Sequence, residues 1–260
     1  MKVVWRYTLA VAVLVLSVVL MTVVGHAGRR ERHMRTCSGI DVKVLDSTRL
    51  SFITVTDVKQ CIREGYGPWL GRRLDSIGLH KIEEVLKDRS AILTSEAYTT
   101  RDGILHVRVT QREPIVRFQG PDGGFYSDEN GFLFPLQSGY TSRVPIIDGQ
   151  VPVRTEAGYK GQARTARERQ WIEGIIGLVR YIGRNKTWAE AIVQITVDAR
   201  GDIVMVARTG KERFIFGAPD DWQDKFARME RYYNTIAPSV EEGCYSTVSV
   251  KYPGQIICRK

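Results

Sequence analysis

The chain is poor in the residues that carry covalent and metal chemistry. It holds four cysteines and four histidines in 260 residues. No CxxC or HExxH motif occurs, no serine stands in GxSxG or SxxK, and no glycine-rich segment has the spacing of a phosphate-binding loop. We therefore predict no catalytic residue, no metal site and no cofactor. Four cysteines are also too few for a disulfide-stapled scaffold, so a hydrophobic core must hold the fold together.

Prolines are scarce too, at 9, and 43% of the residues are hydrophobic. This composition excludes a disordered or collagen-like chain. Lysine and arginine outnumber acidic residues by 38 to 29, a net charge of +9, which suits a nucleic acid, an anionic membrane surface or an acidic polymer. The arginines at 164, 167 and 169 have no aromatic residues between them, so we interpret them as a solvated helix face and expect no nucleic-acid partner.

Long apolar runs are absent except at residues 8–24, a run of seventeen residues without a charge. With its neighbours, such a helix just crosses a hydrocarbon core of roughly 30 Å. Trp5 and Tyr7 precede it, where an aromatic belt lies. We predict an uncleaved transmembrane helix over residues 8–25. The alternative is a cleaved signal peptide with small residues at Gly25 and Ala27, but its apolar region is usually only about 7–15 residues long.

The orientation of this predicted helix in the membrane depends on the positive charges at its two ends, which nearly balance. Lys2 and Arg6 precede the run, and arginines at 29, 30, 32 and 35 follow it. A signal-like N-terminus usually sends a long C-terminal part outward. We therefore predict a cytoplasmic tail over residues 1–7 and a basic juxtamembrane linker over 26–36. The chain is then a single-pass protein of the cytoplasmic (inner) membrane with its bulk in the periplasm.

A first domain is predicted over residues 37–114. A strand alternates at residues 40–44, a helix capped by Thr56 or Asp57 ends at Gly65, and a second helix covers residues 79–86. Residues 91–100 and 104–112 form a hairpin. The element order is strand, helix, helix, strand, strand. Cys37 and Cys61 share this domain, either as a disulfide or as free buried thiols.

A second, β-rich domain with flanking helices is predicted over residues 115–260, which makes the fold class α+β. A hairpin turns at Asn130-Gly131, and a long helix covers residues 163–183, although Gly174 and Gly177 weaken it. Residues 192–197 pair with 203–207, residue 208 faces 214–216, and Pro219 opens another helix, whose acidic start is a dipole complement rather than a metal site.

The final predicted hairpin turns at Pro253-Gly254 and places Cys258 opposite Ser249 or Val250. Cys244 is then on the order of 15–20 Å away, too far for a disulfide with Cys258.

Several short motifs follow one another in a fixed order. The strand over 104–112 runs into Arg112-Glu113-Pro114, and the next hairpin carries an aromatic-x-D-x-x-G-x-x-F pattern at residues 126–134. Residues 144–149 read Val-Pro-Ile-Ile-Asp-Gly, and Phe216-Gly217 precede a helix containing Lys225 and Phe226. Together they resemble the FtsQ/DivIB cell-division family, whose first extracytoplasmic module is a POTRA domain. The residues 118–120, where that family has a shorter link, and the cysteines depart from the pattern.

The resemblance implies a non-catalytic bitopic scaffold of the bacterial divisome. Such proteins bind the division proteins FtsL and FtsB and help control septal peptidoglycan synthesis, which brings the septal synthase in as an indirect partner. Family members engage FtsB through the last strands of the β domain. In this chain the corresponding partner-binding residues are Tyr252, Gln255, Ile256, Ile257, Cys258, Arg259 and Lys260.

A strand without a second neighbour is a template for β-augmentation, which agrees with this assignment. Ile256 and Cys258 would at the same time fill the core, since alternate residues face opposite sides. Proline at Ile257, or at Ile256 if the N–H of Ile257 faces inward, is expected to break the pairing. The strand over 104–112 is the second candidate edge.

Two other functional classes remain. A POTRA-bearing outer-membrane assembly or secretion component would carry tandem POTRA domains and a long alternating barrel, and no such barrel is visible in the sequence. An anchored cell-wall hydrolase would need a nucleophile or a metal set, and the sequence shows neither.

Overall fold

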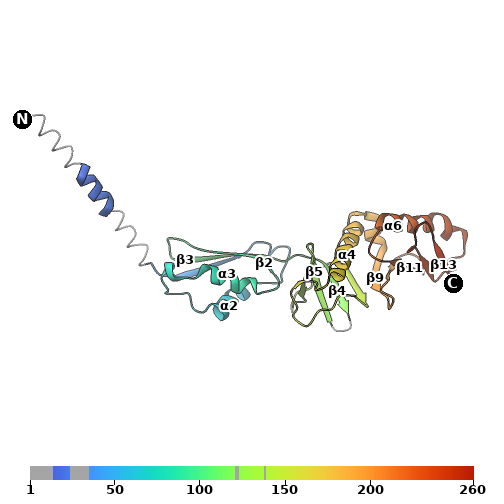
Figure 1. The fold of residues 1–260 in the computed structure, drawn as a ribbon, viewed down its shortest axis with the longest axis horizontal. Helices are drawn as coiled ribbons and strands as arrows, with labels where there is room; N and C mark the ends of the chain where they lie inside the picture. Colours follow the sequence, from blue (N-terminus) through green and yellow to red (C-terminus); the bar gives the residue numbers. More distant parts are fainter. Residues whose placement is uncertain (1–13, 24–34, 121–122, 138) are drawn as a thin grey trace, which may run out of the picture. The chain divides into compact units, whose positions relative to one another are not determined.

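The structure is a computed structural model that describes residues 14–23, 35–120, 123–137 and 139–260 (Figure 1). Residues 14–23 form a helix. Within the described ranges, no helix is both long and apolar enough to cross a membrane. The predicted tail 1–7, the rest of the predicted transmembrane segment and residues 26–34 of the linker lie outside the described residues. The chain divides into two compact units, Met1–Gln111 and Arg112–Lys260.

The first unit is a three-stranded sheet with two helices. The strands are β1 (Gly39–Val44), β2 (Ile92–Thr99) and β3 (Ile104–Gln111), and the helices are α2 (Val55–Gly65) and α3 (Leu79–Lys87). β3 lies in the centre, parallel to β1 and antiparallel to β2. The predicted order of strands and helices is confirmed. The second candidate edge, over 104–112, is wrong, because β3 has a neighbour on both sides.

Apolar residues on one face of this sheet pack against both helices. Val58, Ile62, Ile82, Leu86 and Leu105 are all buried in that core. Helix α2 begins earlier than predicted. Its N-cap is Thr54, whose hydroxyl accepts from the N–H of Asp57 at 3.2 Å, while the Asp57 carboxylate accepts from the N–H of Thr54 at 2.8 Å. This capping box explains why a cap at Thr56 or Asp57 is wrong.

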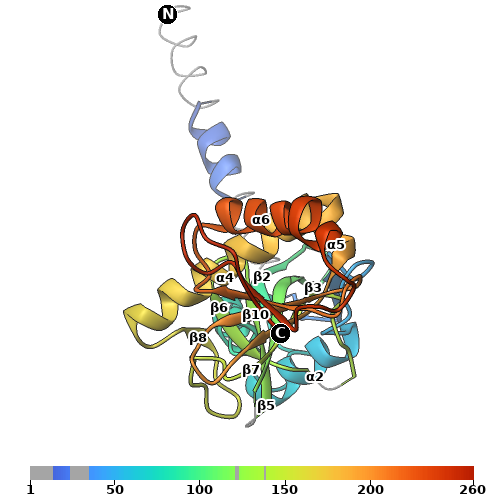
Figure 2. The same cartoon turned by 90° about the vertical axis from the view of Figure 1, so that its right-hand side faces the viewer.

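The second unit is a ten-stranded sheet covered by helices. Its strand order is β13-β12-β11-β10-β9-β7-β4-β5-β6-β8. The strands are β4 (Pro114–Gly120), β5 (Gly123–Asp128), β6 (Phe132–Pro135), β7 (Ile146–Gly149), β8 (Gly161–Gln162), β9 (Ile192–Val197), β10 (Ile203–Ala207), β11 (Arg213–Gly217), β12 (Thr247–Ser249) and β13 (Ile257–Arg259). The helices are α4 (Ala166–Arg184), α5 (Lys186–Ala191) and α6 (Trp222–Arg231), which lie above the strands in Figure 2.

Several predicted boundaries in this unit are wrong. The supposed link at 118–120 belongs to strand β4, whose Val116 and Phe118 are fully buried. Helix α4 begins after the N-cap Thr165 rather than at residue 163, and α6 begins at Trp222 rather than at Pro219. Arg208 does not pair with residues 214–216. Strand β10 pairs with them instead, and Met205 lies opposite Phe214. Helix α5 was not predicted.

The two glycines that weaken the prediction of α4 have a packing role. A Cβ on Gly174 would lie 2.6 Å from the carbonyl oxygen of Pro219, and a Cβ on Gly177 would lie 2.2 Å from the ring of Trp222. The Trp222 indole N–H also donates to the Pro219 carbonyl at 2.9 Å. The segment before α6 therefore approaches α4 so closely that only glycine fits.

We expect alanine at Gly174 or Gly177 to destabilise the second unit by about 1–3 kcal/mol, the usual cost of overpacking. Gly183 in the same helix has open space around its Cβ position, so Gly183→Ala should instead stabilise by about 0.5–1 kcal/mol through helix propensity. Urea unfolding of the three variants measures the difference. Equal effects at all three positions would contradict the packing role.

The motif at residues 126–134 is a turn held by one carboxylate. Asp128 accepts from the N–H groups of Asn130 and Phe132, each at 2.9 Å, and Gly131 adopts a φ of +75° that favours glycine. The same carboxylate pairs with Arg112, whose guanidinium stacks 3.8 Å from the ring centre of Phe132. Asp128 is 3% exposed. The Arg112 motif and the following hairpin motif are therefore one buried cluster.

Candidate partner-binding edge

The predicted partner-binding residues lie at one edge of the ten-stranded sheet. β13 contains Ile257, Cys258 and Arg259, and its single strand neighbour in the described part of the chain is β12. β12 in turn runs parallel to β11. In Figure 1 β13 and β11 lie at the C-terminal end of the second unit. The structure thus places the predicted residues together on a strand edge and its preceding turn.

The predicted turn at Pro253-Gly254 is confirmed. Gln255 N–H donates to the Tyr252 carbonyl at 3.3 Å, and Gly254 has a φ of +70°. The predicted pairing is wrong, because Cys258 lies opposite Val248. The reason is the loop, since all of residues 250–256 lie between the two strands. All four cysteines are free thiols, including Cys37 and Cys61.

Hydrogen bonds between β11 and β12 determine which backbone groups of β12 face β13. Arg213 N–H donates to the Ser246 carbonyl, and Val250 N–H donates to the Ile215 carbonyl, both at 3.0 Å. In a parallel ladder this pattern turns the N–H and C=O of Val248 toward β11. Because these groups alternate along a strand, the residues on either side of Val248 turn theirs toward β13.

The backbone of β13 follows from that alternation. Thr247 faces Arg259 and Ser249 faces Ile257, so Ile257 and Arg259 use their N–H and C=O groups on β12. Cys258 stands between them, and its N–H and C=O point away from β12. The donor that a partner strand would need is therefore the N–H of Cys258. The N–H of Ile257 faces inward.

Side chains of the edge divide as expected between core and solvent. Ile256 and Cys258 pack against the core, and burial raises the pKa of the Cys258 thiol. Ile257 is half-buried, and Tyr252 is 50% exposed. Gln255, Arg259 and Lys260 are exposed. The edge thus offers an open backbone beside apolar and cationic side chains.

Two cationic side chains anchor the β12–β13 hairpin to the rest of the unit, and neither contact was predicted. The buried Arg228 on α6 donates from Nε and Nη2 to the Val250 carbonyl at 3.0 and 2.9 Å. Lys251 Nζ donates to both carboxylate oxygens of Asp202 at 2.7 and 2.8 Å, which raises the pKa of Lys251. The signal for Arg228 was present, because it lies between Phe226 and Met229 on the inner face of α6.

A buried cation also holds the segment between Phe216 and the start of α6. Lys225 is buried and donates to the Ala218 carbonyl at 2.8 Å while pairing with Asp220. Its ammonium lies 5.1 Å from the ring centre of Phe216, which packs against Phe226. Lys225 therefore orders the chain that connects β11 to α6.

Two tyrosines pack beneath the edge. Burial, followed by the charge of Glu212, raises the pKa of Tyr232 to about 12, and the same two causes raise the pKa of Tyr233. The folded state therefore favours neutral hydroxyls, which stabilise the fold fully below pH about 10. That contribution is lost as the pH rises from about 10 through the folded pKa.

We expect the urea midpoint of the second unit to fall between about pH 10 and pH 12. The double variant Tyr232→Phe, Tyr233→Phe should lose less over the same range, because it has no hydroxyls to ionise there. Urea titrations at a series of pH values test this. Parallel curves for the two proteins would show that these tyrosines do not couple to folding.

A polar arrangement in the first unit also escaped prediction. The ring of His106 lies between Asp41, 3.1 Å from Nδ1, and the hydroxyl of Thr100, 3.0 Å from Nε2, and stacks on Tyr98. The Thr100 hydroxyl also donates to Asp102. The arrangement ties β1 to the β2–β3 hairpin.

Two family models match the chain. The model for FtsQ/DivIB, C-terminal related, covers residues 113–259, which is more than half of the chain. The chain belongs to the FtsQ/DivIB family. A model for a POTRA-like domain covers residues 35–110. The predicted resemblance is confirmed.

Membership of the FtsQ/DivIB family makes this a cell-division type of protein, and the family is generally non-catalytic. The two matched ranges meet where the two units of the structure meet. No curated protein matches the chain. Within the described ranges, no group of three or more His, Cys, Asp or Glu residues is placed to hold a metal ion.

Proposed function

We propose that this FtsQ/DivIB protein is a non-catalytic, single-pass scaffold of the division septum. It links FtsB- and FtsL-type partners through β13 and thereby helps control septal peptidoglycan synthesis. The observation that carries the proposal is the open side of β13, where Cys258 presents an N–H and a C=O with no strand neighbour in the described part of the chain.

The chemistry of the edge supports a partner that adds a strand. Main-chain hydrogen bonds provide affinity in β-augmentation, and pockets for alternate side chains provide specificity. Ile257 and Tyr252 offer apolar contact beside the strand, and Arg259 and Lys260 offer positive charge. An acidic, extended partner segment fits that surface.

The proposed location is the cytoplasmic (inner) membrane, with the two units outside the cytoplasm. The apolar run at residues 8–24 supports this location. A reporter that is active only outside the cytoplasm, fused after Lys260, should be active, and the protein should retain residues 1–27. Loss of those residues would contradict the anchor.

Depletion of the protein followed by microscopy tests the proposed function. We expect filamentous cells without completed septa, rescued by the full chain but not by a chain ending at Pro253, which lacks β13. Cooperative melting of the truncated protein is the folding control. Normal septation after depletion would contradict the scaffold role, and release of soluble fragments from peptidoglycan would favour the hydrolase instead.

A further inference from the structure

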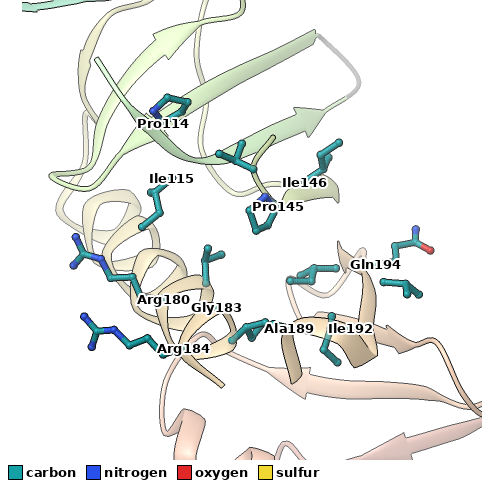
Figure 3. A pocket seen from close by; sticks show the side chains of 15 residues that line it. Pro114, Ile115, Pro145, Ile146, Arg180, Gly183, Arg184, Ala189, Ile192 and Gln194 are labelled. Atoms are coloured by element: carbon teal, nitrogen blue, oxygen red, sulfur yellow. The ribbon is translucent and has the colours of Figure 1, made fainter. Parts of the chain in front are cut away.

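A cavity of about 540 Å³ lies in the same unit, away from β13 (Figure 3). It lies where the neighbouring parallel strands β4, β7 and β9 begin, beside the last turns of α4. Its lining is largely aliphatic and includes Ile115, Pro145, Ile146, Ile192 and Val193. The volume falls in the range of about 300–1,000 Å³ that is typical of binding sites.

The mouth of this cavity leaves apolar surface in water. Ile146 is 50% exposed and Val193 is 51% exposed. In the described part of the second unit, the other large hydrophobic side chain with such exposure is Tyr252, at the candidate edge. Large hydrophobic side chains left exposed beside an apolar cavity can mark an interaction site. Since β7 lies between β4 and β9, its backbone is already paired, so an occupant must be recognised through side chains.

Positive charge borders one side of the cavity. Arg180 and Arg184 stand one turn apart on α4, about 6 Å along its axis, and Figure 3 shows both guanidinium groups on the same side of the helix. Arg180 pairs at 3.0 Å with the exposed Glu129. Arg184 forms no ion pair with any residue that the structure describes. The planar guanidinium group of arginine binds a carboxylate through two parallel hydrogen bonds.

We propose that this cavity docks an acidic amphipathic helix of a partner protein. Its aliphatic side chains enter between Ile146 and Val193, and carboxylates one helical turn apart face Arg180 and Arg184. Two cations in line along a helix match such a row of carboxylates, whereas one fatty-acid headgroup would need cations that converge on it. The site uses none of the residues of β13, so it goes beyond the proposed strand pairing.

Isoleucine-methyl NMR of the full chain, held in nanodiscs of zwitterionic lipid, tests the proposal. The probes are two synthetic amphipathic helical peptides that differ only in having glutamate or lysine on the polar face, with dodecanoate as a third. The glutamate peptide should shift the methyls of Ile115, Ile146 and Ile192 but not that of Ile62. The lysine peptide should bind at least about tenfold more weakly, a difference of 1.4 kcal/mol.

Matched variants separate the apolar from the ionic contribution. Val193→Ser and Arg184→Glu should each weaken the glutamate peptide about tenfold, and Arg184→Glu should strengthen the lysine peptide. The controls Leu93→Ser and Arg200→Glu, also at exposed positions, should leave both peptides unchanged. Cys258→Pro should leave peptide binding intact, so a failure of this site is distinguishable from a failure of the edge.

Three results would overturn the proposal: unshifted cavity methyls with the glutamate peptide, equal binding of the two peptides, or dodecanoate shifting the same methyls more tightly than the peptide. The last result would identify an acyl-chain site instead.

Discussion

Asp128→Ala is expected to lower the free energy of unfolding of the second unit by about 3–5 kcal/mol, because it breaks a buried ion pair by removing one partner. The variant leaves the Arg112 guanidinium without this carboxylate. It also removes the acceptor for the N–H groups of Asn130 and Phe132. The turn between β5 and β6 then loses both of these hydrogen bonds. Urea unfolding followed by tryptophan fluorescence measures the loss.

The neighbouring residue supplies the control. Glu129 pairs with Arg180 on the surface and is largely exposed, so Glu129→Ala should cost only about 0–1 kcal/mol. Similar losses for the two variants would show that Asp128 is no more important to the turn than an exposed carboxylate.

Cys258→Pro is expected to weaken binding of an FtsB-type partner by at least about tenfold, or 1.4 kcal/mol, while the protein stays folded. Proline is tolerated on an edge strand where the N–H faces outward, and at Cys258 that N–H is the one a partner strand would use. Binding of the full chain to the partner, measured by calorimetry, gives the affinity. Unchanged affinity would show that this donor is not part of the interface.

Two controls separate the backbone from the side chain. Cys258→Ala removes the packed thiol but keeps the N–H, so it should retain most of the affinity. Ile257→Pro removes a donor that serves β12, so it should lower stability by about the cost of a broken ladder hydrogen bond, roughly 1–3 kcal/mol. If Ile257→Pro were fully stable, the assigned direction of the strand would be wrong.

The first unit could be predicted because its elements follow clear periodicities. Leu79, Ile82 and Leu86 mark one face of α3, and the β2–β3 hairpin turns at a glycine with positive φ, Gly103. The motif at Tyr126 to Phe134 was also visible, although its pairing with Arg112 depends on folded geometry. Short elements were missed. Helix α5 has six residues, too few for a periodic signal.

The candidate edge could be located from the sequence, but which of its N–H groups face outward could not be predicted. A shift of one residue in register reverses which N–H groups face outward, and the loop over residues 250–256 sets that register. A tight turn at Pro253-Gly254 predicts Cys258 opposite Ser249 or Val250, whereas the wider loop places it opposite Val248. The position of Arg228 on the inner face of α6 could be read from the sequence. Its bond to the Val250 carbonyl and the bond of Lys251 to Asp202 could not, because each joins segments that are distant in the sequence.

Amide hydrogen exchange at Cys258 tests the account most directly. In the free chain, the N–H groups of Ile257 and Arg259 should exchange slowly because they are bonded to β12, and that of Cys258 should exchange quickly. Saturation with the FtsB-type partner should slow exchange at Cys258 into the range of its two neighbours. Rapid exchange at Cys258 while the partner is bound would contradict strand addition at β13.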